Sequence, residues 1–145
     1  MSVAAVLLSS CTTTTSITST TKLRPPVITE TFTRLACSQS STVGMEGCAE
    51  AQLLKGDALL NREVHLLFTL LPTKSQQRSF VRAEKAWLAF RAADCQSTAD
   101  VYQRGTFEPV AYGQCEVNDD LARSSSLHSY FLTLEQGSSP VPTWP

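Results

Sequence analysis

The sequence has few charged residues, and neither sign of charge dominates. Only 17% of the 145 residues are charged, and twelve basic against thirteen acidic residues leave a net charge of −1. A protein that binds nucleic acid through its phosphates needs a basic surplus, so we expect no nucleic-acid partner. No apolar run approaches the roughly 18 residues of a membrane-spanning helix. With 42% hydrophobic residues, the chain can still bury the core of one small domain.

Motifs for catalysis and metal binding are also missing. The two histidines, His65 and His128, have no partner at the spacing of metal ligands. No nucleophile elbow, zinc-protease motif, phosphate-binding loop or kinase motif is present. Glu116, Asp119 and Asp120 cluster, but acids are favoured near the start of a helix by its dipole. We therefore expect no catalytic site, no metal, no cofactor and no enzymatic activity.

Residues 1–11 resemble a signal for export. Residues 3–8 are apolar, and residues 8–11 (L-S-S-C) resemble the lipobox of bacterial lipoproteins, in which Cys11 would carry the lipid. No basic residue precedes this short run, which a start codon placed too far downstream would explain. The alternative is a buried N-terminal strand with a stray cysteine. We expect a lipoprotein of the bacterial envelope, facing the periplasm or on the surface, with the lipid as its only membrane attachment.

Two terminal segments have little to bury. Residues 12–21 hold seven threonines, two serines and one isoleucine, and two prolines follow at 25 and 26. We expect residues 12–33 to be an extended tether, or a disordered N-terminus if no anchor exists. The tail, residues 137–145, holds three prolines and is expected to be disordered.

The cysteines outside the lipobox form an even set, Cys37, Cys48, Cys95 and Cys115, which allows three pairings. In an exported protein of this size two disulfides are expected. We favour Cys37–Cys48 and Cys95–Cys115, because each bond would tie a helix to its adjoining loop and contribute about 3 kcal/mol. The alternative, four free thiols in a cytosolic domain, is what a small metal or redox protein would require.

Apolar spacing predicts three helices within a domain at residues 34–136. The first begins near Met45 and stops at Pro72; the second starts at a capping box on Thr73 and fades after Cys95. The third begins near Pro109 and ends near residue 137. The fold class is therefore all-α, a small antiparallel bundle of about three helices with two disulfides. The residues expected on the inward faces are Leu53, Leu60, Val64, Leu67 and Leu71, then Phe80, Ala83, Trp87, Phe90 and Asp94, then Val117, Leu121, Leu127, Phe131 and Leu134.

Residues 83–95 read A-E-K-A-W-L-A-F-R-A-A-D-C and are similar to the signature helix of the lysozyme-inhibitor LprI-like family, A-x-x-A-W-L-x-F-R-D-A-x-C. Residues 45–49 (M-E-G-C-A) and 57–61 (D-A-L-L-N) resemble two further motifs of that family, M-N-x-C-A and A-D-x-x-L-N. The resemblance extends from about residue 37 to 134. It supports the fold more than any particular binding activity.

The signature helix is interpreted as a packing helix. Trp87 and Phe90 are expected to bury large apolar areas, and Arg91 is expected to pair with Asp94 three residues later. Gly47 departs from good helix-forming sequence at a cost of about 1 kcal/mol relative to Ala.

The resemblance implies a protein partner, a lysozyme-type peptidoglycan hydrolase whose cleft is blocked without chemistry. The candidate surface is a loop over residues 96–114, held at its ends by the second disulfide. A lysozyme is cationic with an acidic cleft, so Glu108 or Arg104 could supply complementary charge. One alternative is a covered connector with inward-facing aromatic residues; another is a structural or adaptor lipoprotein of an envelope complex. The candidate partner-binding residues are Tyr102, Arg104, Phe107, Glu108 and Tyr112.

Overall fold

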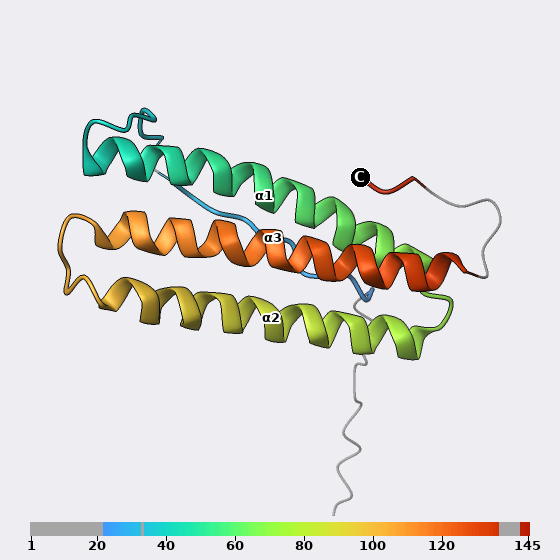
Figure 1. Ribbon diagram of the computed structural model, residues 1–145. Coiled ribbons are helices and arrows are strands. Elements are labelled where there is room, and N and C mark those ends of the chain that lie inside the picture. The colour runs from blue at the N-terminus through green and yellow to red at the C-terminus, as the bar shows by residue number, and fades with distance from the viewer. Residues whose placement is uncertain (1–21, 33, 137–142) are drawn as a thin grey trace, which may run out of the picture.

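Three long helices make up the domain, and the middle one in sequence runs antiparallel to the other two (Figure 1). The computed structural model describes residues 22–32, 34–136 and 143–145, and its helices are α1 (Thr42–Leu70), α2 (Lys74–Asp100) and α3 (Glu108–Glu135). The described residues contain no strand, and the all-α prediction is confirmed. None of the helices described here has the length and apolarity to cross a membrane. The proposed lipid site, Cys11, lies outside the described residues.

The helices are arranged around α3, which packs against both α1 and α2, whereas α1 and α2 hardly touch each other. The short α1–α2 connection predicted two neighbouring antiparallel helices. They are antiparallel, but each packs mainly against α3 and not against the other.

Polar caps fix the junction between α1 and α2. The backbone of Leu71 is extended ahead of Pro72, so α1 ends there as predicted. The Thr73 hydroxyl accepts a hydrogen bond from Gln76 N, and the Gln76 side chain accepts one from Thr73 N. This capping box confirms the predicted start of α2.

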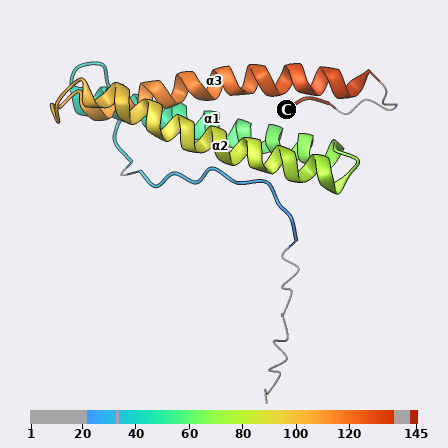
Figure 2. The ribbon, with the colours of Figure 1, turned by 90° about the horizontal axis from the view of Figure 1, so that it is seen from below.

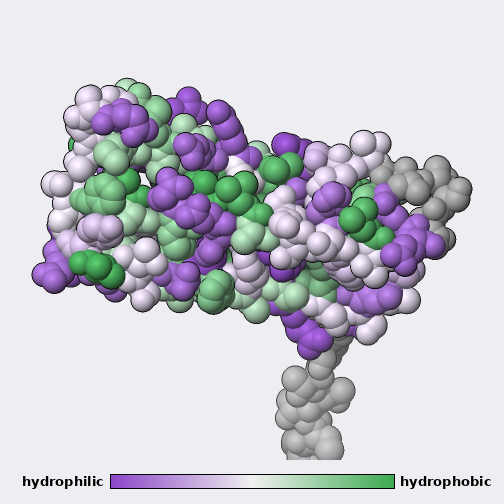
Figure 3. All heavy atoms as spheres, viewed as in Figure 1, coloured by the Kyte–Doolittle hydropathy of each residue, from purple (hydrophilic) through white to green (hydrophobic). Residues whose placement is uncertain are grey.

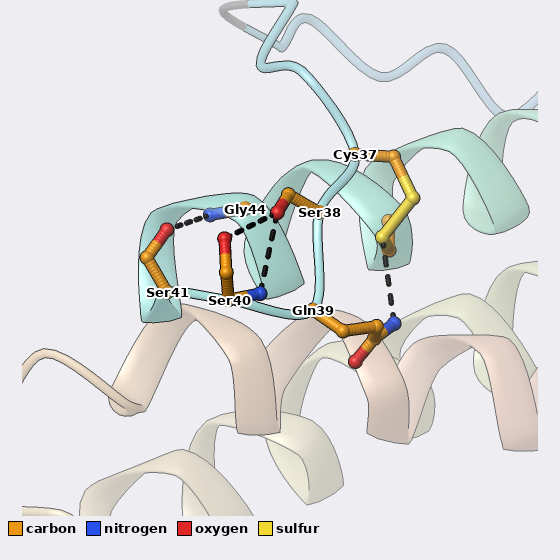
Figure 4. Close-up of a disulfide and its surroundings, with 7 residues drawn as sticks. Cys37, Ser38, Gln39, Ser40, Ser41 and Gly44 are labelled. Carbon is orange, nitrogen blue, oxygen red and sulfur yellow. Dashed lines mark hydrogen bonds between the residues drawn. A yellow bond between two sulfur atoms is a disulfide. The ribbon is translucent and has the colours of Figure 1, made fainter.

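The first turn of α1 begins three residues earlier than predicted, because Ser41 is its N-cap. Figure 4 shows Ser41 Oγ accepting a hydrogen bond from Gly44 N at 3.1 Å, beside the disulfide that joins Cys37 to α1. The incoming chain passes directly over this turn: a Cβ atom on Gly47 would lie 2.9 Å from Ala36 O. A glycine that weakens the helix in isolation therefore permits the close approach that the Cys37–Cys48 bond requires.

The second helix continues to Asp100 and does not fade at Cys95 as predicted. Ala99 is buried, and Gln96 Nε2 donates a hydrogen bond to Asp100 Oδ1 at 2.7 Å. Residues 96–100 are mostly polar because only the face with Ala99 is covered, so the sequence did not indicate that the helix continues here. The connection to α3 is correspondingly short, residues 101–107.

The apolar core fills the half of the bundle next to the α1–α2 junction. It comprises Leu60, Val64, Leu67, Leu71, Phe80, Leu127 and Phe131. All of these positions were predicted to face inward, and the burial of leucines on α1 follows the expected stripe.

Four positions predicted to face inward are exposed: Ala83, Phe90, Asp94 and Leu121. Leu121, 64% exposed, lines a shallow apolar groove between α1 and α3. Hydrophobic side chains are visible along the seam between these two helices in Figure 3. Three of these positions are on α2 and one is on α3, so both helices are covered over narrower faces than the spacing suggested.

The segment before α1 packs against the bundle, contrary to the prediction of a free tether up to residue 33. We call residues 22–32 and 34–41 the N-terminal strap. It runs along the side of the bundle away from α3 (Figure 2). Ile28 N donates to Asn61 Oδ1 at 2.8 Å, and Asn61 Nδ2 donates to Ile28 O at 2.9 Å. Of the expected tether, residues 12–21 lie outside the described residues.

The chain end also contacts the core, so the expected disorder does not hold for residues 143–145. The Trp144 ring lies 4.8 Å from the Phe131 ring and 5.1 Å from the His128 ring, measured between centroids. The remainder of the expected disordered tail, residues 137–142, lies outside the described residues.

Candidate functional site

Arg91 lies in the middle of the bundle, where the strap, α1 and α3 each provide acids. Its side chain is only 4% exposed, and Nη2 lies 3.1 Å from Asp57 Oδ1. Nε lies 3.0 Å from Asp120 Oδ1. Nη1 lies 3.3 Å from Glu30 Oε1 in the strap and 3.4 Å from Glu116 Oε1. One buried cation therefore joins all three helices and the strap, and we call these five residues the Arg91 cluster.

The Arg91 cluster holds more acid than base. Burial, with a smaller contribution from neighbouring Asp57, raises the pKa of Asp120 to about 8 despite the opposing effect of Arg91. Burial also raises the pKa values of Asp57 and Glu116. At neutral pH protonated Asp120 donates a hydrogen bond to Asp57, so the two acids share one proton. Both are nearly fully buried and tied to Arg91, which suits them to holding helices together.

A cleft of about 430 Å³ opens at the end of the bundle that carries the disulfides. We call it the acidic cleft, because four glutamates line it and no lysine, arginine or histidine does so among the described residues. Its inner end borders the Arg91 cluster through Glu116. Tyr112 donates a hydrogen bond to Glu116, and burial together with this acid raises the tyrosine pKa. The lining residues include Glu46, Glu50, Glu108 and Glu116, with Phe32, Leu53, Ala99, Pro109 and Tyr112 as apolar walls.

The predicted binding loop is shorter than expected, and it divides the five candidate residues into two groups. Tyr102, Arg104 and Phe107 lie in the connection between α2 and α3, whereas Glu108 and Tyr112 belong to α3 and line the acidic cleft. The Tyr102 and Phe107 rings pack with centroids 5.0 Å apart. The two groups are nevertheless adjacent, at one end of the molecule.

The second disulfide joins Cys95 of α2 to Cys115 of α3, and the first joins Cys37 to Cys48, so the predicted pairing is confirmed. The Cys95–Cys115 bond closes the connection that carries Arg104. Gln103 and Arg104 there have φ values of 49° and 61°, in the left-handed region. Residues other than glycine adopt this region rarely, so the turn is held in a costly conformation by its surroundings.

The signature helix contributes one central residue and two that differ from expectation. Arg91 does not pair with Asp94, which is exposed. The partners of Arg91 come from the strap, α1 and α3. Phe90 is 57% exposed, so the expectation that it buries a large area is wrong. Trp87 is half-buried between two guanidinium groups, 5.9 Å from Arg91 and 5.7 Å from Arg123, and Arg123 pairs with Glu84.

Four acids of the Arg91 cluster were not identified as a group from the sequence. Asp57 stood within a family motif, and Glu116 and Asp120 were interpreted as acids at the start of a helix. Glu116 and Asp120 lie in the interior of α3, four residues apart, and therefore face the same neighbour. This i, i+4 spacing was the only local signal, and nothing in the sequence connects the pair to Arg91 on α2.

Groups at metal-ligand spacing are restricted, in the described part of the chain, to Cys95, Cys115 and Asp119. The two sulfur atoms form a disulfide and offer no thiolate to a metal. His65 and His128 are both exposed, and the His128 ring stacks on Trp144.

Comparison with known proteins gives one match. The family model described as lysozyme inhibitor LprI matches residues 35–127, which include all three predicted motifs, both disulfides and four of the five residues of the Arg91 cluster. No curated protein and no solved structure matches the chain. The matched family is one of inhibitors and not of enzymes. Since the match covers most of the sequence, the chain belongs to the lysozyme inhibitor LprI family.

Proposed function

We propose that this protein binds a lysozyme-type peptidoglycan hydrolase in the bacterial envelope and inhibits it by covering its catalytic cleft. The observation that carries the proposal is the family match over residues 35–127. Inhibition of this kind needs only a stable complex, so it requires no catalytic group of the inhibitor.

The connection between α2 and α3 provides a suitable contact surface. The Cys95–Cys115 bond and the packed rings of Tyr102 and Phe107 limit its motion, so little entropy is lost on binding. Arg104 is exposed next to these aromatic residues. Lysozymes cleave with a pair of carboxyl groups, and a cation presented to that pair gains charge complementarity. Aromatic and arginine side chains also dominate the binding energy of many interfaces.

The envelope location rests on two features. Disulfides persist in oxidising compartments, and both pairs in this domain are bonded. The lipobox-like residues 8–11 would attach the protein through a lipid on Cys11, and residues 12–21 would separate the domain from the membrane surface.

A cell-wall lysis assay with the full oxidised chain tests the proposal. We expect lysis by a lysozyme to slow at near-equimolar ratio, and Arg104→Glu to weaken inhibition about tenfold or more. Arg78→Glu changes another exposed arginine, on α2, and is the matched control. Unchanged lysis by several lysozyme-type hydrolases would overturn the proposal. Recovery of an envelope assembly and no hydrolase in affinity capture would then favour the adaptor alternative.

A further inference from the structure

The acidic cleft carries negative charge that the described residues do not neutralise. Glu46, Glu50 and Glu108 line it, and no basic side chain of the described residues reaches it. Glu108 Oε2 is fully buried and has no hydrogen-bond partner in the described part of the chain. A buried, unpaired carboxylate oxygen is costly, and a cationic donor in the cleft would remove that cost.

A second observation at the inner end of the cleft points the same way. Glu116 lines the cleft, is only 3% exposed, and shares a single guanidinium with three other carboxyl groups. Arg91 supplies one positive charge to four carboxyl groups, so it cannot neutralise all of them if they are ionised. A second cation placed in the cleft would reach the one member of the Arg91 cluster that borders this space.

The walls of the cleft restrict which cation fits. Phe32, Leu53 and Pro109 offer apolar surface on the way to the glutamates. Lysine and arginine combine an apolar stem with a charged end, which matches this order of contacts. The volume of about 430 Å³ lies within the usual range of binding pockets and exceeds what a bare ion would occupy.

We propose that the acidic cleft is an interaction surface that receives a lysine or arginine side chain of a cationic protein partner. The inference rests on the proposed function, because it names the surface and the chemistry by which the hydrolase would be held. Arg104 lies at the same end of the molecule. Adjacent surfaces of opposite charge would fix the orientation of the partner as well as attract it.

Neutralising the cleft without changing its shape tests this proposal. The triple variant E46Q/E50Q/E108Q keeps side-chain size and removes three negative charges. The triple variant D94N/D119N/E135Q removes the same charge elsewhere on the surface and is the matched control. With a lysozyme as titrant in calorimetry, we expect the cleft variant to bind about tenfold or more weakly and with a shallower dependence on salt. The control variant should stay within about threefold of the wild type.

A peptide probe separates this proposal from the proposed function. The peptide acetyl-Gly-Arg-Gly-amide is titrated into the labelled full chain, and amide shifts are expected at Tyr112 and Gly113, which line the cleft. These shifts should disappear in E46Q/E50Q/E108Q. Peptide shifts at the cleft with no lysozyme inhibition would overturn the proposed function and retain the cleft. Inhibition that is equally weakened by both triple variants, or peptide shifts spread over the surface, would overturn the cleft proposal alone.

Discussion

The two halves of the bundle are held together in different ways. The half next to the α1–α2 junction is built on an apolar core of leucine, valine and phenylalanine side chains, and no disulfide crosses it. Two glutamates, Glu63 and Glu84, are buried beside this core, each with its own partner, Ser124 or Arg123. The other half, from Arg91 to the opposite end, has fewer large apolar side chains, and both disulfides and the Arg91 cluster lie there.

The comparison suggests why the acidic cleft lies where it does. An apolar core gains stability from burial and leaves little room for unpaired charge. In the other half, covalent bonds and a shared guanidinium hold the helices, so surplus carboxyl groups can remain beside an open space. In the charged half, the surplus carboxyl groups lower stability, and the same groups form a surface able to bind cations.

The largest expected effect is that of Arg91→Met, which removes the cation from four carboxyl groups. Leaving buried charges without their partner typically costs about 3–5 kcal/mol. We expect a loss of this size in the free energy of unfolding at pH 7.5, measured by urea denaturation. Because the acids can take up protons, the loss should shrink as pH falls toward 5.

Leu67→Ala is the matched test in the apolar half, because Leu67 is fully buried in the core. A cavity costs about 2–5 kcal/mol, and Leu67 is not among the groups that shift the pKa of the buried Glu63 nearby. Its loss should therefore be the same at pH 5 and pH 7.5. A loss that varies with pH for Leu67→Ala, or stays constant for Arg91→Met, would break the comparison between the halves.

The second disulfide should have the next largest effect. Replacing Cys95 and Cys115 by alanine opens a loop of about 20 residues, which removes roughly 3 kcal/mol of stability. Hydrogen exchange should increase first in residues 101–107 and the start of α3. Equal acceleration in the apolar half would mean that the two halves unfold as one unit and are not stabilised separately.

Much of this architecture could be predicted from the sequence, because local signals specified it. The capping box at Thr73, Pro72, and the leucine stripe each correspond to one helix boundary or face. The Arg91 cluster could not be derived in this way, since its acids come from the strap, α1 and α3. The end of α2 at Asp100 was missed for a related reason: its burial depends on contacts with other elements. When a residue is buried by partners that are distant in sequence, the spacing of apolar residues around it does not reveal that burial.

A pH effect on stability is expected from Asp120. Its pKa is about 8 in the folded protein against 3.8 as its ordinary value, so the folded state binds an extra proton between those values. Stability is therefore fully present below about pH 4 and is lost as pH rises through 8, by at most about 1.4 kcal/mol per pH unit. From pH 5.5 to 7.5 these two pKa values imply a loss of about 2.5 kcal/mol. Asp120→Asn should flatten this slope in urea denaturation, and an unchanged slope would contradict the assignment.

The smallest expected effect concerns Phe90, an aromatic residue of the signature helix whose side chain is 57% exposed. Surface substitutions away from special features usually change stability by no more than about 0.5 kcal/mol, so we expect Phe90→Ser to remain within that limit in urea denaturation. Trp87→Ser is the comparison, because Trp87 packs against the apolar core and lies over two guanidinium groups, and it should cost clearly more. Equal losses for the two variants would mean that the signature helix packs on both aromatic residues. The expected inequality would instead place Phe90 among the exposed residues of α2, so its presence in the motif would need a reason other than packing.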